Sequence, residues 1–488
     1  MNTVIEASPA PAAGQAPGPN GADLMARVFA GQQETALRWR TSTAAERIQR
    51  IRALRAAVLD HAEAIRAAAA ADFRKPAAEV DLTEIFPVVA EANHAIRHLR
   101  RWMRPRKVAP SLMLLGTRGT IEQQPRGRCL IISPWNYPVN LTFCPLVLAL
   151  AAGNTAILKP SEMTPHLSAV IRRIVEAVFK PTEVAIFEGE ADVSRQLLDL
   201  PFDHVFFTGS PALGKVVMTA AARHLTSVTL ELGGKSPAII DAGADLAAAA
   251  ANICWSKFLN NGQTCIAPDH IYVEQTVADA FERELTARIK AVFGEGSAQQ
   301  MASPDLARVV NERHTLRLKA LIDDARDRGA RVACGGEVEP ASHFVAPTLL
   351  ADVPAEARIN HEEIFGPVLP LRRFASLDEV AEQINRAPKP LALYIWCGDR
   401  QRARYLLART TSGGACINNS VVHALHPRLP FGGVNNSGIG STHGEFGFRA
   451  FSHARAVTDT RLALVQSFYP PYTHWMRRLI AFAIRYLA

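Results

Sequence analysis

Residues 127–160 read GRCLIISPWNYPVNLTFCPLVLALAAGNTAILKP, and this stretch decides the fold class. Two short apolar runs, CLII and TAIL, flank a longer apolar run that ends in a glycine. A strand, a helix and a second strand in this order predict a parallel unit, because parallel strands need a crossover connection. The alternation continues through SAVIRRIVEAVF, VAIFEG, HVFFTG and LGKVVMTAAARHL, and so predicts a parallel α/β sheet.

A second series of patterns follows on the C-terminal side. The chain length of 488 residues exceeds what one compact core usually holds and favours two or more domains. The fold class is therefore α/β, with a second α/β domain after the first. This second series predicts helices near 244–259, 276–292 and 311–328, and strands near 343–350, 366–373, 391–397 and 414–418.

The segments before residue 127 are of three kinds. Residues 1–20 are rich in Ala, Pro and Gly without a hydrophobic period, so we expect a disordered leader. Residues 22–103 carry apolar side chains at helical spacing and predict three helices. Residues 108–124, with Gly116 and Gly119 between short apolar runs, predict a hairpin.

Composition excludes several classes of protein. Hydrophobic residues make up 48% and charged residues 20% of the chain, a balance typical of globular proteins that opposes disorder over most of the length. The net charge of +8 is modest. The basic cluster within residues 97–107 reads as a solvated helix end, and no nucleic-acid module accompanies it.

The seven cysteines are scattered and lack CxxC or Cys/His spacing, so we expect neither a disulfide framework nor a metal site. No signal-peptide pattern opens the chain, and no run reaches the ~20 apolar residues of a spanning helix. The expected compartment is a reducing cytoplasm.

One cysteine differs from the others in its surroundings. Cys265 closes the sequence NGQTC, a polar, glycine-containing loop after a helical pattern, and reactive side chains are commonly presented on such loops. The other six lie mostly in apolar strand-like or helical runs, which are typical of inert packing thiols. Cys265 is therefore the candidate nucleophile.

Two polar residues accompany this cysteine. Glu231 ends a strand-like run beside Gly233 and Gly234, where α/β domains expose catalytic groups, although it could instead cap a helix or pair with Lys235. Asn136 lies where the strand CLII gives way to a helix, so its amide can project into a cleft as an oxyanion donor.

Several separate motifs now occur in the order of one enzyme family. They are PWNYP (134–138), KPSE (159–162), FTGS (207–210), ELGGK (231–235), GQTC (262–265), EEIFGP (362–367) and PFGG (430–433). From about Leu24 to about Val457 the chain resembles the aldehyde dehydrogenase superfamily. The detail of KVVMTAAARHL, GQTCIAPD, PLALY and SGIGSTHG resembles its class 3 and coniferyl aldehyde dehydrogenases.

The resemblance implies the aldehyde dehydrogenase fold: a Rossmann-like dinucleotide-binding domain, a catalytic domain and a small bridging or oligomerisation element. The implied boundaries are 21–108 with 126–232 for the dinucleotide-binding domain, 233–422 for the catalytic domain, 109–125 with 423–460 for the bridging segments, and 461–488 for a C-terminal tail. It also implies a homodimer, formed through the 109–124 hairpin and the segment after PFGG.

Residue roles follow from the same resemblance. Cys265 matches the nucleophile, Glu231 the general base, and Asn136 the oxyanion donor together with the Cys265 backbone N–H. A phosphate at the helix start near Pro211, where the family usually has Thr, would meet free backbone N–H groups. The residues that match cofactor contacts are Trp135, Lys159, Glu162, Gly209, Ser210, Gly214, Leu232, Gly233, Glu363 and Phe365.

The implied reaction is NAD(P)-dependent oxidation of an aldehyde to the carboxylic acid through a thiohemiacetal and a thioester on Cys265. Glu162 favours NAD, because a carboxylate accepts ribose hydroxyls and repels a 2′-phosphate, while NADP stays an alternative. The substrate stays open between an aromatic aldehyde, such as coniferyl aldehyde, and a long-chain aliphatic one.

Three other functions compete with this one. A thiol esterase is opposed by the cofactor motifs KPSE and EEIFGP. A catalytically silent membrane-associated or scaffold homologue is opposed by the intact Cys265, Glu231 and Asn136. An enzyme that passes the thioester to coenzyme A is opposed by the retained Glu231.

The C-terminal residues 474–488 predict an amphipathic helix. Fifteen residues at about 1.5 Å each reach only ~22 Å, short of the ~30 Å hydrocarbon layer, so this helix cannot span a membrane. It either contacts an anionic membrane surface or docks on the protein. Its predicted apolar side carries Met476, Ile480, Ala483, Ile484 and Leu487, opposite Arg478 and Arg485.

Overall fold

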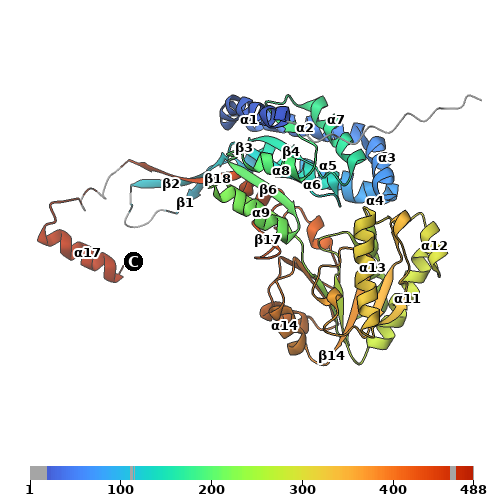
Figure 1. Cartoon of the computed structure of the whole chain (residues 1–488). Coiled ribbons are helices and arrows are strands. Elements are labelled where there is room, and N and C mark those ends of the chain that lie inside the picture. The colour runs from blue at the N-terminus through green and yellow to red at the C-terminus, as the bar shows by residue number, and fades with distance from the viewer. Residues whose placement is uncertain (1–18, 110–113, 115, 462–465, 467–468, 487–488) are drawn as a thin grey trace, which may run out of the picture.

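The computed structural model describes residues 19–109, 114, 116–461, 466 and 469–486. Two α/β bodies lie against one another, and a narrow arm projects from the first (Figure 1). Most of the predicted leader, residues 1–18, lies outside the described residues. Its last two residues belong to helix α1 (Pro19–Arg40).

The first body is built on a six-stranded sheet with the order β17-β7-β6-β3-β4-β5. Five of its strands, β5, β4, β3, β6 and β7, run parallel to one another, which confirms the α/β prediction. The sixth strand, β17, pairs antiparallel with β7. The chain winds outward from β3 to β5 and then returns to the other side of β3, so the winding reverses between β3 and β6. Ligands of such sheets bind beyond the carboxyl ends at this switch point. The strands are β3 (Arg128–Ile132), β4 (Thr155–Lys159), β5 (Val184–Ile186), β6 (His204–Gly209), β7 (Ser227–Leu232) and β17 (Gly438–Ile439).

Helices cover both faces of this sheet, because successive apolar side chains of β3 point to opposite faces and both faces must be buried. Cys129 and Ile131 pack with α2 (Ala44–Asp60), α5 (Phe86–Trp102), α6 (Pro138–Ala152) and α7 (Pro165–Val178). Leu130 and Ile132 point to the other face, because successive strand residues alternate. There they pack with α1, α8 (Ala191–Leu198) and α9 (Pro211–Ala222).

The prediction of three helices before residue 103 is wrong, because the chain breaks more often there. Thr43 caps α2 through a capping box with Glu46, which separates α2 from α1. Arg74, with a φ of 53°, ends α3 (Ala62–Phe73). A short helix α4 (Ala77–Val80) and a π-helical turn (Asp81–Ile85) then lead into α5.

The second body is built on a seven-stranded sheet with the order β10-β13-β14-β9-β8-β15-β16. The predicted helices are α10 (Leu246–Phe258), α11 (Ala278–Phe293) and α13 (Glu312–Asp327). The single strand predicted at 343–350 is wrong, because it divides around Pro347 into β12 (Phe344–Val345) and β13 (Thr348–Ala351). The other strands are β8 (Pro237–Ile240), β9 (His270–Glu274), β10 (Arg331–Cys334), β14 (Val368–Phe374), β15 (Ala392–Trp396) and β16 (Gly414–Ile417).

The arm is an antiparallel sheet of β1 (Arg106–Val108), β2 (Thr117–Pro125) and β18 (Ser452–Thr460). The predicted hairpin is the β1–β2 pair, but β2 pairs over its whole length with β18, more than 300 residues later in the chain. At the end of the arm lies α17 (His474–Tyr486), well away from both bodies (Figure 1). The predicted C-terminal helix is therefore present.

Candidate active site

The site lies where the two bodies face each other. The carboxyl ends of β3 and β7 carry Asn136 and Glu231, and the loop before β9 carries Cys265. Glu231 and Cys265 line the same cavity, of about 190 Å³. The structure thus brings together three residues that lie far apart in the sequence.

A strained turn presents the cysteine. Asn260, Asn261 and Gly262 have φ values of 52°, 53° and 74°. This left-handed region is costly for a residue with a side chain, although asparagine tolerates it better than most, and such strain is characteristic of functional sites. A Cβ at Gly262 would lie 2.3 Å from the Gly366 carbonyl oxygen, so only glycine fits there.

Gln263 holds this turn from inside the protein. Its Nε2 donates to the carbonyl oxygens of Asn260 and Arg308, both at 3.0 Å. Its Oε1 accepts from the Val310 N–H at 2.9 Å. The motif GQTC contains Gln263, but the sequence pattern indicated no role for it. The structure shows that it fixes the loop before Cys265.

Asn136 reaches the same loop from the first body. Its Nδ2 donates to the Gln263 carbonyl oxygen at 2.9 Å, and its own backbone carbonyl accepts from Asn260 Nδ2 at 2.8 Å. A side-chain amide carries two N–H groups, and this contact uses one of them. The other N–H has no acceptor among the described residues.

Glu231 is buried, and neither carboxylate oxygen has a hydrogen-bond partner among the described residues. Burial raises the pKa of this carboxyl well above its usual range. Lys235 does not pair with it. Instead, Lys235 Nζ lies 2.5 Å from Asp269 Oδ1 and donates to the Ile359 and Glu362 carbonyls. The helix-cap and Lys235-pair alternatives for Glu231 are therefore wrong.

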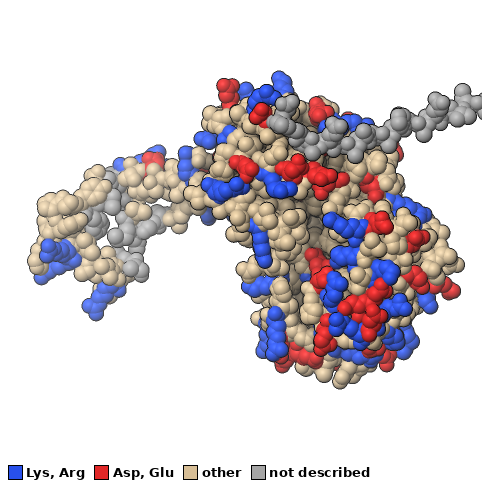
Figure 2. Space-filling model, in the orientation of Figure 1, with Lys and Arg blue, Asp and Glu red and all other residues tan. Residues whose placement is uncertain are grey.

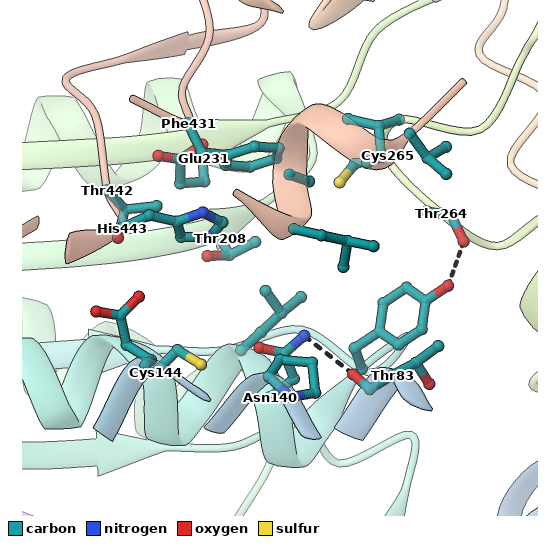
Figure 3. A pocket seen from close by; sticks show the side chains of 18 of the residues that line it. Thr83, Asn140, Cys144, Thr208, Glu231, Thr264, Cys265, Phe431, Thr442 and His443 are labelled. Atoms are coloured by element: carbon teal, nitrogen blue, oxygen red, sulfur yellow. Dashed lines mark hydrogen bonds between the residues drawn. The ribbon is translucent and has the colours of Figure 1, made fainter. Parts of the chain in front are cut away.

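The cavity is mostly apolar. Figure 3 shows Cys265 and Glu231 along one side, with Thr83, Asn140 and Cys144 on the opposite side. Helices of both bodies contribute to it. The described residues that line it include no lysine or arginine, and its larger apolar side chains include Leu82, Phe86, Leu141, Trp255, Ile266 and Leu425.

His443 also lines this cavity. Its ring stacks on Phe431 with centroids 5.0 Å apart. Burial lowers the pKa of His443 to about 4, so the ring is neutral near pH 7. An isolated histidine after the PFGG motif gives no signal in the sequence that it will face the cavity.

The thiol of Cys265 is protonated in this environment. Burial raises its pKa to about 12, and the negative charges of Glu363 and Glu231 add to this effect. The backbone N–H groups of Cys265 and Ile266 act in the opposite direction. Nucleophilic attack therefore needs a group that accepts the proton.

The predicted ribose and phosphate contacts lie at the carboxyl edge of the first sheet. Lys159 ends β4, and its Nζ lies 3.0 Å from Glu162 Oε2. Ser210 caps α9, with Pro211 as the first helical residue. Ser210 follows β6 and Trp135 follows β3, so the two residues flank the switch point of the sheet. A dinucleotide fits this arrangement, because its phosphates would meet the N-terminus of α9.

The predicted nicotinamide contacts approach from the second body. Glu363 Oε1 accepts from the Gly234 N–H at 3.0 Å. A Cβ at Gly233 would lie 2.2 Å from Glu363 Oε2, so a larger residue there would displace this carboxylate. A second cavity, of about 590 Å³, is lined by Pro211, Gly234 and Glu363. The space between α9 and Glu363 is thus open to a ligand.

The remaining predicted cofactor residues pack around these groups. The rings of Trp135 and Phe365 meet edge to face with centroids 5.3 Å apart, and Phe365 has a φ of 46°. A Cβ at Gly214 would lie 2.7 Å from Leu232, so this glycine allows α9 to pack closely on β7. Gly209 ends β6, directly before Ser210.

Comparison with known proteins gives a consistent result. Residues 8–457 match the aldehyde dehydrogenase family. The probable coniferyl aldehyde dehydrogenase of Caulobacter vibrioides is 39% identical, over 95% of this chain and 97% of its own. The dimeric NADP-preferring aldehyde dehydrogenase of Rattus norvegicus is 40% identical, over 84% of this chain and 89% of its own.

A solved structure extends this similarity to three dimensions. The substrate-bound AldH of Staphylococcus aureus superposes with a TM-score of 0.89 at 36% identity, covering 94% of this chain and 99% of its own. The similarity thus includes both bodies and not the dinucleotide-binding part alone.

Proposed function

The chain belongs to the aldehyde dehydrogenase family, and on that premise we propose which residues carry its reaction. It is an NAD(P)-dependent aldehyde dehydrogenase. Cys265 is the nucleophile, Asn136 the oxyanion donor and Glu231 the general base. The observation that supports these roles best is that Cys265 shares a mostly apolar cavity with a buried carboxylate, Glu231, which has no partner among the described residues.

In the first half of the reaction the Cys265 thiol loses its proton to water, its sulfur bonds to the aldehyde carbon, and the aldehyde oxygen becomes an oxyanion. The free N–H of Asn136 and the backbone N–H of Cys265 donate to this oxygen. Bound NAD(P) supplies the acceptor for the hydride that leaves the carbon. The oxidised carbon then remains on Cys265 as a thioester.

In the second half Glu231 accepts a proton from a water molecule, and the water oxygen attacks the thioester carbon. The carbon–sulfur bond breaks, the carboxylic acid leaves and Cys265 is restored. A carboxylate with a raised pKa is suited to this step, because it holds a proton more strongly than an ordinary glutamate. Asn136 stabilises the second oxyanion as it does the first.

Lys159, Glu162, Ser210 and Glu363 would hold the cofactor. The Lys159 ammonium is already paired with Glu162, so it offers little net positive charge to a 2′-phosphate. The Glu162 carboxylate would accept ribose hydroxyls and repel that phosphate. We therefore favour NAD, with NADP as the weaker alternative.

The cavity wall supports a proposal for the substrate class. A cavity lined by apolar side chains without lysine or arginine suits an uncharged apolar aldehyde, aromatic or long-chain aliphatic. The name of the Caulobacter relative supports the aromatic class. Initial rates with coniferyl aldehyde, benzaldehyde and decanal, each with NAD and NADP, test both choices. Mass spectrometry of the quenched enzyme should find the acyl group on Cys265, and an unmodified Cys265 under turnover would reject the mechanism.

For the assembly we propose a homodimer formed through the arm and the segment after PFGG. The rat relative is named as dimeric, and the arm extends beyond the folded body (Figure 1). Light scattering should give twice the 53.1 kDa chain mass. A mass equal to that of one chain would reject the dimer.

The C-terminal helix α17 suits either a membrane surface or the protein itself. Among the residues that the structure describes, no helix combines the length and apolar character needed to cross a membrane. The predicted apolar side of α17 is buried at one residue and exposed at another, because Met476 is only 7% exposed whereas Ile484 is 70% exposed. Figure 2 shows basic side chains at this end of the arm, where α17 carries Arg477, Arg478 and Arg485. An anionic membrane surface would match this combination.

A further inference from the structure

Two buried tyrosines hold the residues on either side of Cys265. The Tyr137 hydroxyl lies 2.5 Å from Thr264 Oγ1. The Tyr394 hydroxyl donates to the Ile266 carbonyl oxygen, also at 2.5 Å. Tyr137 lies in the motif PWNYP and Tyr394 in PLALY, but the sequence pattern gave neither phenol a role, and the reaction proposed above does not use them.

The tyrosines come from different bodies. Tyr137 directly precedes α6 on the first sheet, whereas Tyr394 lies in the middle of β15 on the second sheet. Both side chains are buried. The peptide around Cys265 is therefore held from both sides of the interface between the bodies.

The segment they hold is a turn. The Ala267 N–H donates to the Thr264 carbonyl oxygen at 3.0 Å, which places Cys265 and Ile266 at the two central positions. Tyr137 thus holds the side chain of the first turn residue, and Tyr394 holds the carbonyl of the third. Together these contacts fix the orientation of the two central N–H groups.

Those two N–H groups are what favours the ionised sulfur. They lower the pKa of the Cys265 thiol, against burial and the charges of Glu363 and Glu231, which raise it. A small rotation of the turn would withdraw the N–H groups from the sulfur. The titratable groups facing the sulfur are those two carboxyls and the two phenols.

The first phenol is itself fixed by a buried ion pair. Lys75 Nζ lies 4.2 Å from the centre of the Tyr137 ring and 3.1 Å from Glu84 Oε1. Glu84 Oε2 accepts from the N–H groups of Val139 and Asn140, both at 3.0 Å, at the start of α6. The Lys75 ammonium therefore packs on one face of the Tyr137 ring and is held there by Glu84.

We propose that Tyr137 and Tyr394 are positioning residues, which hold the turn Thr264–Ala267 so that the N–H groups of Cys265 and Ile266 point at the sulfur. The proposal rests on Cys265 being the nucleophile. It assigns to the two hydroxyls a role in the reactivity of the thiol and none in binding the cofactor.

The test compares Tyr137→Phe, Tyr394→Phe and Thr264→Val with the wild-type protein. Without cofactor, the rate of Cys265 alkylation by iodoacetamide is measured from pH 7 to 10, with peptide mapping to assign the alkylated cysteine. Well below the thiol pKa the rate follows the thiolate fraction, so a pKa raised by about one unit slows alkylation roughly tenfold. We expect each variant to show this loss, with NAD affinity unchanged.

Three controls separate positioning from folding. Thr264→Ser keeps the hydroxyl that meets Tyr137 and should restore the wild-type alkylation rate. Tyr405→Phe removes a phenol that donates to Asp378 on the surface, and should change nothing. Thermal unfolding shows whether a variant is folded. Wild-type alkylation rates in folded Tyr394→Phe and Thr264→Val would overturn the proposal, whereas full activity in Cys265→Ala would overturn the mechanism beneath it.

Discussion

The Asn136 side-chain amide donates to the carbonyl oxygen of Gln263, 127 residues later in the chain and two residues before Cys265. One N–H therefore fixes the loop, and the second is free to meet the oxyanion. Asn136→Ala should lower kcat by about 10²–10³ and leave the Kd for NAD unchanged, because the amide acts mainly in the transition state. Steady-state kinetics and cofactor titration check this. A raised KM with kcat unchanged would mean that Asn136 only helps to bind the aldehyde.

Cys265→Ala should abolish both aldehyde oxidation and any ester hydrolysis, while cofactor binding persists. The matched control is Cys254→Ala, which removes a buried thiol from α10 that packs in the core of the second body. This control should keep turnover and lose some stability. Substantial turnover in Cys265→Ala would contradict the proposed mechanism.

Glu231→Gln should slow hydrolysis of the thioester more than its formation. A burst of NADH should then precede slow turnover in stopped-flow experiments, since acylation still proceeds while the water lacks its base. A variant that forms no NADH in a single turnover would show that Glu231 acts before the thioester exists.

Glu91, a buried carboxyl that lines the same cavity as Cys265, should make stability depend on pH. Glu91 accepts from the Gly444 N–H at 3.0 Å, and burial raises its pKa from 4.5 to about 7. The folded state then binds more protons than the unfolded state, so Glu91 lowers the free energy of unfolding as pH rises from about 4.5 to 7. The shift corresponds to roughly 3 kcal/mol as an order of magnitude.

Glu91→Gln should remove this part of the pH dependence. Urea unfolding at pH 5 and pH 8 measures it, and the difference between the two pH values should be smaller in the variant. Equal pH dependence in both proteins would show that Glu91 does not titrate in this range.

The sequence predicts local elements and motif residues better than contacts between distant segments. The alternation after Gly127 predicts the parallel sheet because each apolar run is itself a buried strand or helix. The Tyr394 contact with Ile266 joins residues 128 positions apart, and no local pattern records it. The residues that line the cavity also cannot be predicted from the sequence, because Phe86 and Trp255 look like ordinary apolar positions of helical segments.

Where the sequence disagrees with the structure, backbone breaks explain the difference. Arg74 adopts a left-handed conformation without glycine, and Pro347 interrupts what reads as one strand. The C-terminal helix differs in another way. Its hydrophobic period predicts one apolar side, but Ile484 is exposed while Met476 is buried, because the period does not say which surface lies beside the helix.

The last prediction concerns what α17 contacts. A truncated chain ending at Ser467 lacks the helix and its three arginines, whereas the arm strands remain. If α17 binds membranes, the full-length protein should sediment with anionic vesicles and the truncated chain should not. Binding should weaken with salt, because the arginines contribute through screened charges.

Docking of α17 on the protein predicts a different experimental result. If α17 docks on the protein, both chains should bind vesicles equally poorly, and the truncated chain should unfold at lower temperature because Met476 loses its buried contacts. A triple Arg477→Gln, Arg478→Gln, Arg485→Gln variant distinguishes the forces involved. It should lose vesicle binding and keep its stability in the membrane case, since all three arginines are exposed and Met476 still packs. Vesicle binding retained by this variant would contradict recognition of an anionic surface through these arginines.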